Sequence, residues 1–172
     1  NFLLVMLFVL PIDLLFQHLT RGENSLLLYQ QFLTWILYVI QSSLGIEVYI
    51  RGENSTILAY ADIIDMEIVA ECGGLHETVF LSLLVLCFRG VKPMVRAKWA
   101  IYAAFFIFVE NLIRILSGYY LINIYDFSTW DKFHYFWWHT GQYALIMGVF
   151  ILWVMTVAGR PENKSVKKNY TR

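Results

Sequence analysis

Long apolar runs separated by short polar segments are the feature that most restricts how this chain can fold. Five such runs cover residues 1–19, 26–44, 72–88, 99–120 and 134–158. A helix of roughly 20 apolar residues crosses the hydrocarbon layer of a bilayer. The pattern predicts an all-α polytopic membrane bundle of about five to six transmembrane helices. We expect one transmembrane domain over residues 1–158, followed by a basic cytoplasmic tail over 159–172.

Composition supports this class of protein. The chain is 59% hydrophobic and only 15% charged, whereas soluble domains carry roughly 25% charged residues. Its 172 residues leave no room for a separate soluble domain beside five spans. The formal net charge is zero, so no bulk attraction to nucleic acid is implied. Composition therefore predicts an integral membrane protein that has the lipid bilayer as its surroundings and no nucleic-acid partner.

Basic residues are divided unequally between the connecting segments. The loop 89–98, the tail 159–172 and Arg21 hold ten Lys and Arg, whereas segments 45–71 and 121–133 hold two. Because cytoplasmic loops are enriched in Lys and Arg, the loop and the tail are predicted to face the cytoplasm. The segment before Cys72 then faces the outside. Its short apolar runs, 46–50 and 56–60, flank a glycine-containing turn and predict a small surface hairpin.

Cys72 stands where this polar segment meets the third apolar run. A thiol at a helix N-terminus feels the positive end of the helix dipole, which favours thiolate. Gly73 and Gly74 follow it and let other backbone or a substrate come close. The alternative interpretation is that Cys72 is a small buried apolar residue, the commonest environment of a free cysteine.

Two further polar residues are predicted to lie at the level of Cys72. Counted from the nearest basic cytoplasmic residue, Cys72, Arg114 and His139 lie about 26, 24 and 32 Å along their helices, at about 1.5 Å per residue. A thiol, a guanidinium and an imidazole from three different helices therefore reach the outer part of the bilayer together. We interpret this coincidence as a candidate site.

The roles of the neighbouring residues stay open at this point. Glu110 and Asn111 precede Arg114 by four and three residues, so they share its helical face. Arg114 forms either a structural ion pair with Glu110 or a cation held ready for an anionic intermediate. His134 and His76 compete with His139 as the acid or base, because His76 follows Cys72 by four residues and His134 opens the fifth run.

The residues in this order resemble a known family. Cys72-Gly73-Gly74, then Asn111-Leu112-Ile113-Arg114, then His139 resemble the exosortase/archaeosortase family of prokaryotic multi-pass membrane transpeptidases. The family often has Ser or Thr where this chain has Gly73, and its histidine is commonly followed by Gly one turn later, whereas Gly141 comes two residues on.

The resemblance implies an activity and a substrate. Cys72 would be the nucleophile, Arg114 the group that stabilises the oxyanion, and His139 the acid and base. The substrate would be a membrane-anchored protein whose C-terminal sorting signal comprises a short motif, one transmembrane helix and a basic tail. The acceptor would be a lipid, a sugar or water. The location would be the prokaryotic cytoplasmic membrane, with the active site on the extracytoplasmic side and no cofactor.

A second class of function uses the same residues without catalysis. A membrane scaffold or small transporter would use Glu110 and Arg114 as a structural or permeation ion pair. Metal and redox sites are not predicted, since the chain has no Cys-x-x-Cys pair. Cys72 and Cys87 are 15 residues apart on one predicted helix, too far for a disulfide.

Overall fold

The computed structural model describes residues 2–20, 26–60 and 64–158, with the side chains of 2–6, 71 and 158 left out of the description. Within these ranges the chain is mostly helical, as predicted, with five helical segments and one small antiparallel sheet. The predicted tail 159–172 and Arg21 lie outside the described residues.

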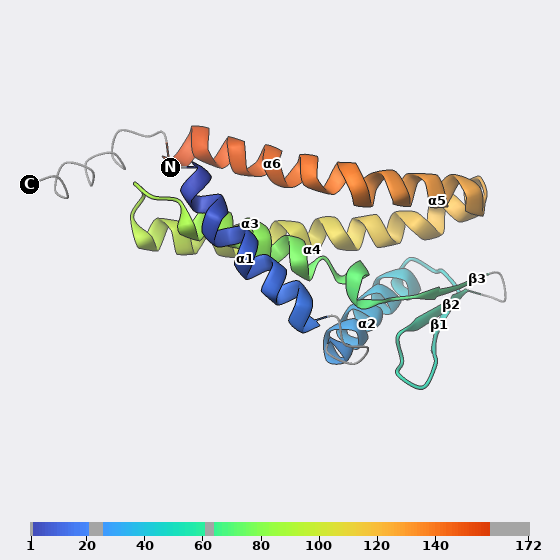
Figure 1. The fold of residues 1–172 in the computed structure, drawn as a ribbon. Coiled ribbons are helices and arrows are strands. Elements are labelled where there is room, and N and C mark those ends of the chain that lie inside the picture. The colour runs from blue at the N-terminus through green and yellow to red at the C-terminus, as the bar shows by residue number, and fades with distance from the viewer. Residues whose placement is uncertain (1, 21–25, 61–63, 159–172) are drawn as a thin grey trace, which may run out of the picture.

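The longest part of the fold is a hairpin of two antiparallel helices (Figure 1). One arm is α4 (Pro93–Ile124). The other is a continuous helix made of α5 (Phe127–Phe136), the π-helical turn η2 (Trp137–Gly141), α6 (Gln142–Trp153) and the π-helical turn η3 (Val154–Ala158). Both arms are long and apolar enough to cross a membrane.

Local sequence sets the ends of these arms. Pro93 occupies the first turn of α4, where its missing N–H would be unpaired in any residue. Asp126 begins α5, because its carboxylate accepts a hydrogen bond from the Thr129 backbone N–H at 2.6 Å. The hydrogen bonds from Thr129 lower the pKa of the Asp126 carboxyl below its usual value. Only Tyr125 and Asp126 therefore separate the two arms.

Two shorter helices pack on one side of this hairpin. α1 (Phe2–Thr20) crosses α3 (Leu75–Cys87), and α3 lies against α4. Thr20 Oγ1 and His76 Nε2 are hydrogen-bonded at 3.2 Å, which joins the end of α1 to the start of α3. The core among these helices consists of apolar side chains from α1, α3, α4 and α6, including Val9, Leu81, Leu84, Ile107, Ile146 and Phe150.

A second core joins α2 (Leu27–Ser43) to the sheet. The strands β1 (Val48–Arg51), β2 (Ile57–Tyr60) and β3 (Ile64–Glu67) are antiparallel in the order β1-β2-β3. In Figure 1 the sheet lies near the end of the hairpin where α4 meets α5. The buried residues of this second core come from α2, the sheet and α4, and include Leu33, Leu37, Val48, Leu58, Tyr60 and Ile115.

One polar pair fixes the sheet to α2. The buried Tyr60 hydroxyl donates a hydrogen bond to Gln41 Oε1 at 3.0 Å. Burial is the main reason that the pKa of Tyr60 rises to about 12, because removing water disfavours the phenolate. This strand residue therefore stays neutral and holds its bond over the ordinary pH range.

The structure confirms some predicted elements and shifts others. The surface hairpin forms as β1 and β2, and β3 adds a strand that was not predicted. The third apolar run, predicted to begin at Cys72, becomes helical only at Leu75, and α3 is 13 residues long. α3 and residues 7–20 of α1 are apolar helices shorter than the two arms that could span a membrane.

Candidate functional site

Cys72 lies in a turn between the sheet and α3. The 3-10 turn η1 (Ala70–Gly73) carries it, and Gly74 follows with φ +66°, the left-handed conformation that favours glycine. Gly74 also directly precedes the first residue of α3. Cys72 is therefore three residues before the helix and not inside its first turn, as the sequence had suggested. Its side chain is half-buried and its thiol is not in a disulfide.

The two glycines allow side chains from other helices to pack closely against this turn. A Cβ on Gly73 would lie 2.6 Å from the ring of Tyr29, whose hydroxyl donates to the Gly73 carbonyl at 2.7 Å. A Cβ on Gly74 would lie 2.9 Å from Asn111 Cγ. Tyr29 comes from α2 and Asn111 from α4, so two helices pack against the turn that carries the cysteine.

Arg114 of α4 forms a hydrogen bond with the backbone of the turn that carries Cys72. The residue as a whole is buried, with 5% of its surface exposed. Nη2 donates to the Cys72 carbonyl oxygen at 3.2 Å and to Asn111 Oδ1 at 2.6 Å. Its Nε and Nη1 are buried and have no hydrogen-bond partner among the described residues. Two donor nitrogens of a buried cation, Nε and Nη1, are therefore unpaired within the described part of the chain and lie beside the cysteine turn.

A cavity of about 160 Å³ brings three of the predicted residues together. Cys72, Arg114 and His134 all line it, along with the β3 end of the sheet and residues Ile115 and Trp130. His134 packs against Trp130, with ring centroids 4.9 Å apart, and its Nδ1 is buried without a partner in the described part of the chain. The cavity thus combines a thiol, a cation and an imidazole.

His139 and His76 line a different cavity. This cavity measures about 410 Å³ and lies between α1, α3 and the second arm of the hairpin, which comprises α5, η2, α6 and η3. Its other lining residues include Gln17, Glu77 and Tyr143. His139 Nδ1 is hydrogen-bonded to the Tyr135 carbonyl at 2.9 Å, and the side chain is exposed. The geometry therefore pairs Cys72 and Arg114 with His134, whereas the sequence had favoured His139.

Glu110 of α4 accepts two hydrogen bonds from the second arm of the hairpin. Its Oε1 accepts from Trp137 Nε1 at 2.8 Å, and its Oε2 accepts from Gln142 Nε2 at 3.2 Å. Trp137 and Gln142 are five residues apart, and the π-helical turn η2 brings them to one side of the helix, because its hydrogen bonds join residues five apart, including Gln142 N–H to Trp137 O. Among the described residues Glu110 makes no ion pair with Arg114, although both line a cavity of about 380 Å³.

No cluster of three or more metal-binding side chains occurs within the described ranges. The groups that sequence reasoning missed are Trp130 and the end of β3, where Met66, Glu67 and Ile68 line the cysteine cavity. The alternation of apolar and acidic residues at 64–67 is typical of a strand and was a usable signal. Compared with known proteins, the chain matches no family model, no curated protein and no solved structure.

Proposed function

We propose that this protein is a membrane-embedded cysteine transpeptidase of the exosortase/archaeosortase type, which cleaves a C-terminal sorting signal and transfers the protein to an acceptor. The observation that carries the proposal is the shared cavity of Cys72, Arg114 and His134. A nucleophile, a buried cation with free donors, and an imidazole are the groups that acyl transfer through a thioester requires.

The outer surface of the helices supports a membrane location. Large apolar side chains on α4, α6 and η3 are at least half exposed, including Ile101, Phe105, Ile113, Ile151, Leu152 and Met155. Soluble proteins rarely expose contiguous apolar surface of this kind. The uneven distribution of Lys and Arg supports a topology with residues 89–98 in the cytoplasm and the cysteine cavity on the extracytoplasmic side.

In the proposed reaction, the Cys72 thiol gives its proton to His134, the resulting thiolate adds to the carbonyl carbon of the scissile peptide bond, and the C=O electron pair moves to the oxygen. Arg114 Nε and Nη1 donate to the resulting oxyanion, in a site where little water competes. When the intermediate collapses, the C–N bond breaks and the leaving amine takes a proton from His134. The products of this half are an acyl thioester on Cys72 and a free amine.

The second half repeats these steps in reverse. His134 takes a proton from the acceptor amine, hydroxyl or water, which attacks the thioester carbonyl. Arg114 stabilises the second oxyanion, and the C–S bond breaks to regenerate the Cys72 thiolate. Asn111 and Gly74 act as positioning residues, because Asn111 orients the Arg114 guanidinium and Gly74 leaves room for Asn111.

The contacts favour catalysis over the scaffold or transporter alternative. That alternative uses Glu110 and Arg114 as a pair, whereas Glu110 bonds Trp137 and Gln142 and so connects the two arms of the hairpin. Arg114 instead bonds the backbone of the cysteine turn.

The test is a tagged reporter that ends in a short motif, one apolar helix and a basic tail, taken from a protein encoded beside this chain. Cys72→Ala is expected to abolish cleavage of the reporter, while Cys87→Ala, at the other end of α3, leaves cleavage intact. During turnover, mass spectrometry should find a hydroxylamine-sensitive adduct of the reporter on Cys72. Cleavage that continues in Cys72→Ala would rule out the mechanism and favour the scaffold.

A further inference from the structure

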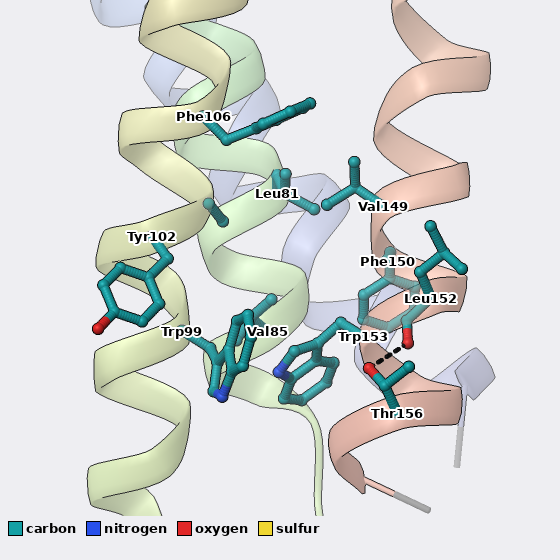
Figure 2. Close-up of a pocket in the computed structure, with 11 residues that line it drawn as sticks. Leu81, Val85, Trp99, Tyr102, Phe106, Val149, Phe150, Leu152, Trp153 and Thr156 are labelled. Carbon is teal, nitrogen blue, oxygen red and sulfur yellow. Dashed lines mark hydrogen bonds between the residues drawn. The ribbon is translucent and has the colours of Figure 1, made fainter.

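Three cavities follow one another along α4 and meet at shared residues. The first, of about 430 Å³, lies between α3, α4 and α6 and ends at Phe106 (Figure 2). Phe106 also lines the second cavity, of about 380 Å³, which extends along α4 past Arg114 to Ser117. Arg114 in turn lines the cavity that contains Cys72. We call this succession the α4 groove.

The α4 groove is apolar for most of its length and open along one side. Figure 2 shows side chains of α4 and α6 on opposite walls, with α3 behind them. Phe106 is 43% exposed, and Tyr102 and Leu152 on its walls are also exposed. Trp99, at the far end, lies 15 residues before Arg114, so the groove runs about 22 Å along α4.

The end of the groove at Cys72 has a different chemistry. β3 is an edge strand of the sheet, and Met66, Glu67 and Ile68 line the cysteine cavity. The Ile68 backbone N–H donates to Thr56 O across the sheet at 2.9 Å. Because antiparallel pairing alternates, the backbone N–H and C=O of Glu67 then point away from β2, toward the free edge. A free strand edge binds an extended peptide through main-chain hydrogen bonds.

We propose that the α4 groove docks an apolar helix of a polypeptide substrate, and that the extended segment before this helix pairs with β3 and so brings its scissile carbonyl to Cys72. The inference rests on the proposed function and adds the surface that recognises the substrate. The strand edge favours a polypeptide over a lipid as the occupant of the groove. A lipid acyl chain fits an apolar groove but has no backbone groups to pair with Glu67. The open side lets the helix enter laterally from the surrounding membrane.

The test uses full-length protein carrying Cys72→Ala in lipid nanodiscs, so that binding is measured without reaction. The photo-reactive amino acid p-benzoylphenylalanine replaces either Phe106 or Phe105. Phe105 is the matched control, because it is the next residue of α4, is 67% exposed and lines none of the three cavities. The probe is a biotinylated synthetic polypeptide with a Thr/Val-rich segment before a Leu/Ala helix of about 20 residues.

We expect several-fold more probe adduct at position 106 than at 105, because residue 106 lines the groove and residue 105 does not. Replacing the Thr/Val segment of the probe with a Gly/Pro segment should reduce the adduct, since proline cannot donate to β3. Leu152→Trp, which fills the groove, should also reduce it, whereas Ile151→Trp on the neighbouring position should not.

Equal adducts at 106 and 105, or no effect of Leu152→Trp, would overturn the proposal. A phospholipid adduct at position 106 that the probe does not displace would identify an acyl chain as the occupant and also overturn it. These outcomes are independent of the reporter test, because a catalytic Cys72 can lose activity on mutation whether or not the groove binds the probe.

Discussion

Substituting Arg114 separates catalysis from structure, because the two roles predict different balances of activity and stability. Arg114→Met removes two hydrogen bonds made by Nη2, a loss of about 3 kcal/mol if each charge-assisted bond contributes about 1.5. It also removes two buried donors that have no partner among the described residues, and each such donor costs about 1–3 kcal/mol. The two effects nearly cancel, so we expect the free energy of unfolding to change by less than about 2 kcal/mol.

Activity should respond very differently. Losing one oxyanion donor lowers kcat by about 100- to 1,000-fold in well-characterised acyl-transfer enzymes. Arg114→Met deletes both available donors, and Arg114→Lys keeps the charge but loses the planar fork that supplies them. We expect both variants to cleave the tagged reporter at least about 100-fold more slowly than the parent. Initial cleavage rates in proteoliposomes and thermal unfolding in detergent measure the two quantities on the same preparations.

Three results would refute this reasoning. Normal cleavage by Arg114→Lys would show that the fork is unnecessary. A loss of stability above about 4 kcal/mol in Arg114→Met would make the residue a structural one. Restored cleavage when Glu110→Gln is added to Arg114→Met would mean that the pair matters only for its charge balance.

Other predictions test the rest of the site and the fold. His134→Ala should slow reporter cleavage by about 100-fold or more, while His139→Ala changes it by less than about threefold, and the reverse ranking would return the acid–base role to His139. The pKa of Tyr60 is raised to about 12 in the fold, so the contribution of Tyr60 to the free energy of unfolding should be constant below about pH 10 and fall by up to about 3 kcal/mol as the pH rises through 12. Unfolding followed by near-ultraviolet circular dichroism should show that Tyr60→Phe removes this alkaline fall, and an equal fall in parent and variant would contradict it. In intact cells an impermeant thiol reagent should label a cysteine placed at Ser128 but not one placed at Lys92, and the opposite pattern would invert the topology.

The elements that sequence could predict are those set by local pattern. Long apolar runs specify α4 and α6, and short apolar runs around a turn specify the hairpin of β1 and β2. The proximity of Cys72 and Arg114, which are joined by a hydrogen bond, was also predictable, since counting residues along their helices placed both at one depth in the membrane. Each of these conclusions needs only the periodicity of one segment or the length of one helix.

The remaining features depend on contacts between segments. Counting backward from the tail favoured His139, because it took no account of how the helix is oriented about its axis. The Asp126 cap starts α5 seven residues before His134, and packing against Trp130 then places His134 in the cysteine cavity. Glu110 had the spacing for an ion pair with Arg114 but bonds two donors from the opposite arm, which its own helix does not reveal. The structure also gives a reason for Gly73, since the ring of Tyr29 occupies the space of a side chain there.

The π-helical turn η2 has a consequence for how this chain tolerates insertions and deletions. A five-residue turn contains one residue more than an α-helix needs to return to the same face. Deleting the exposed Thr140 would leave Trp137 and Gln142 four residues apart, the spacing at which an α-helix also presents both to Glu110. All of α6 would then keep its facing, whereas the same deletion within α6 would rotate every later side chain by about 100°. The turn therefore marks a position at which chain length can change by one residue while the contacts on both sides stay in phase.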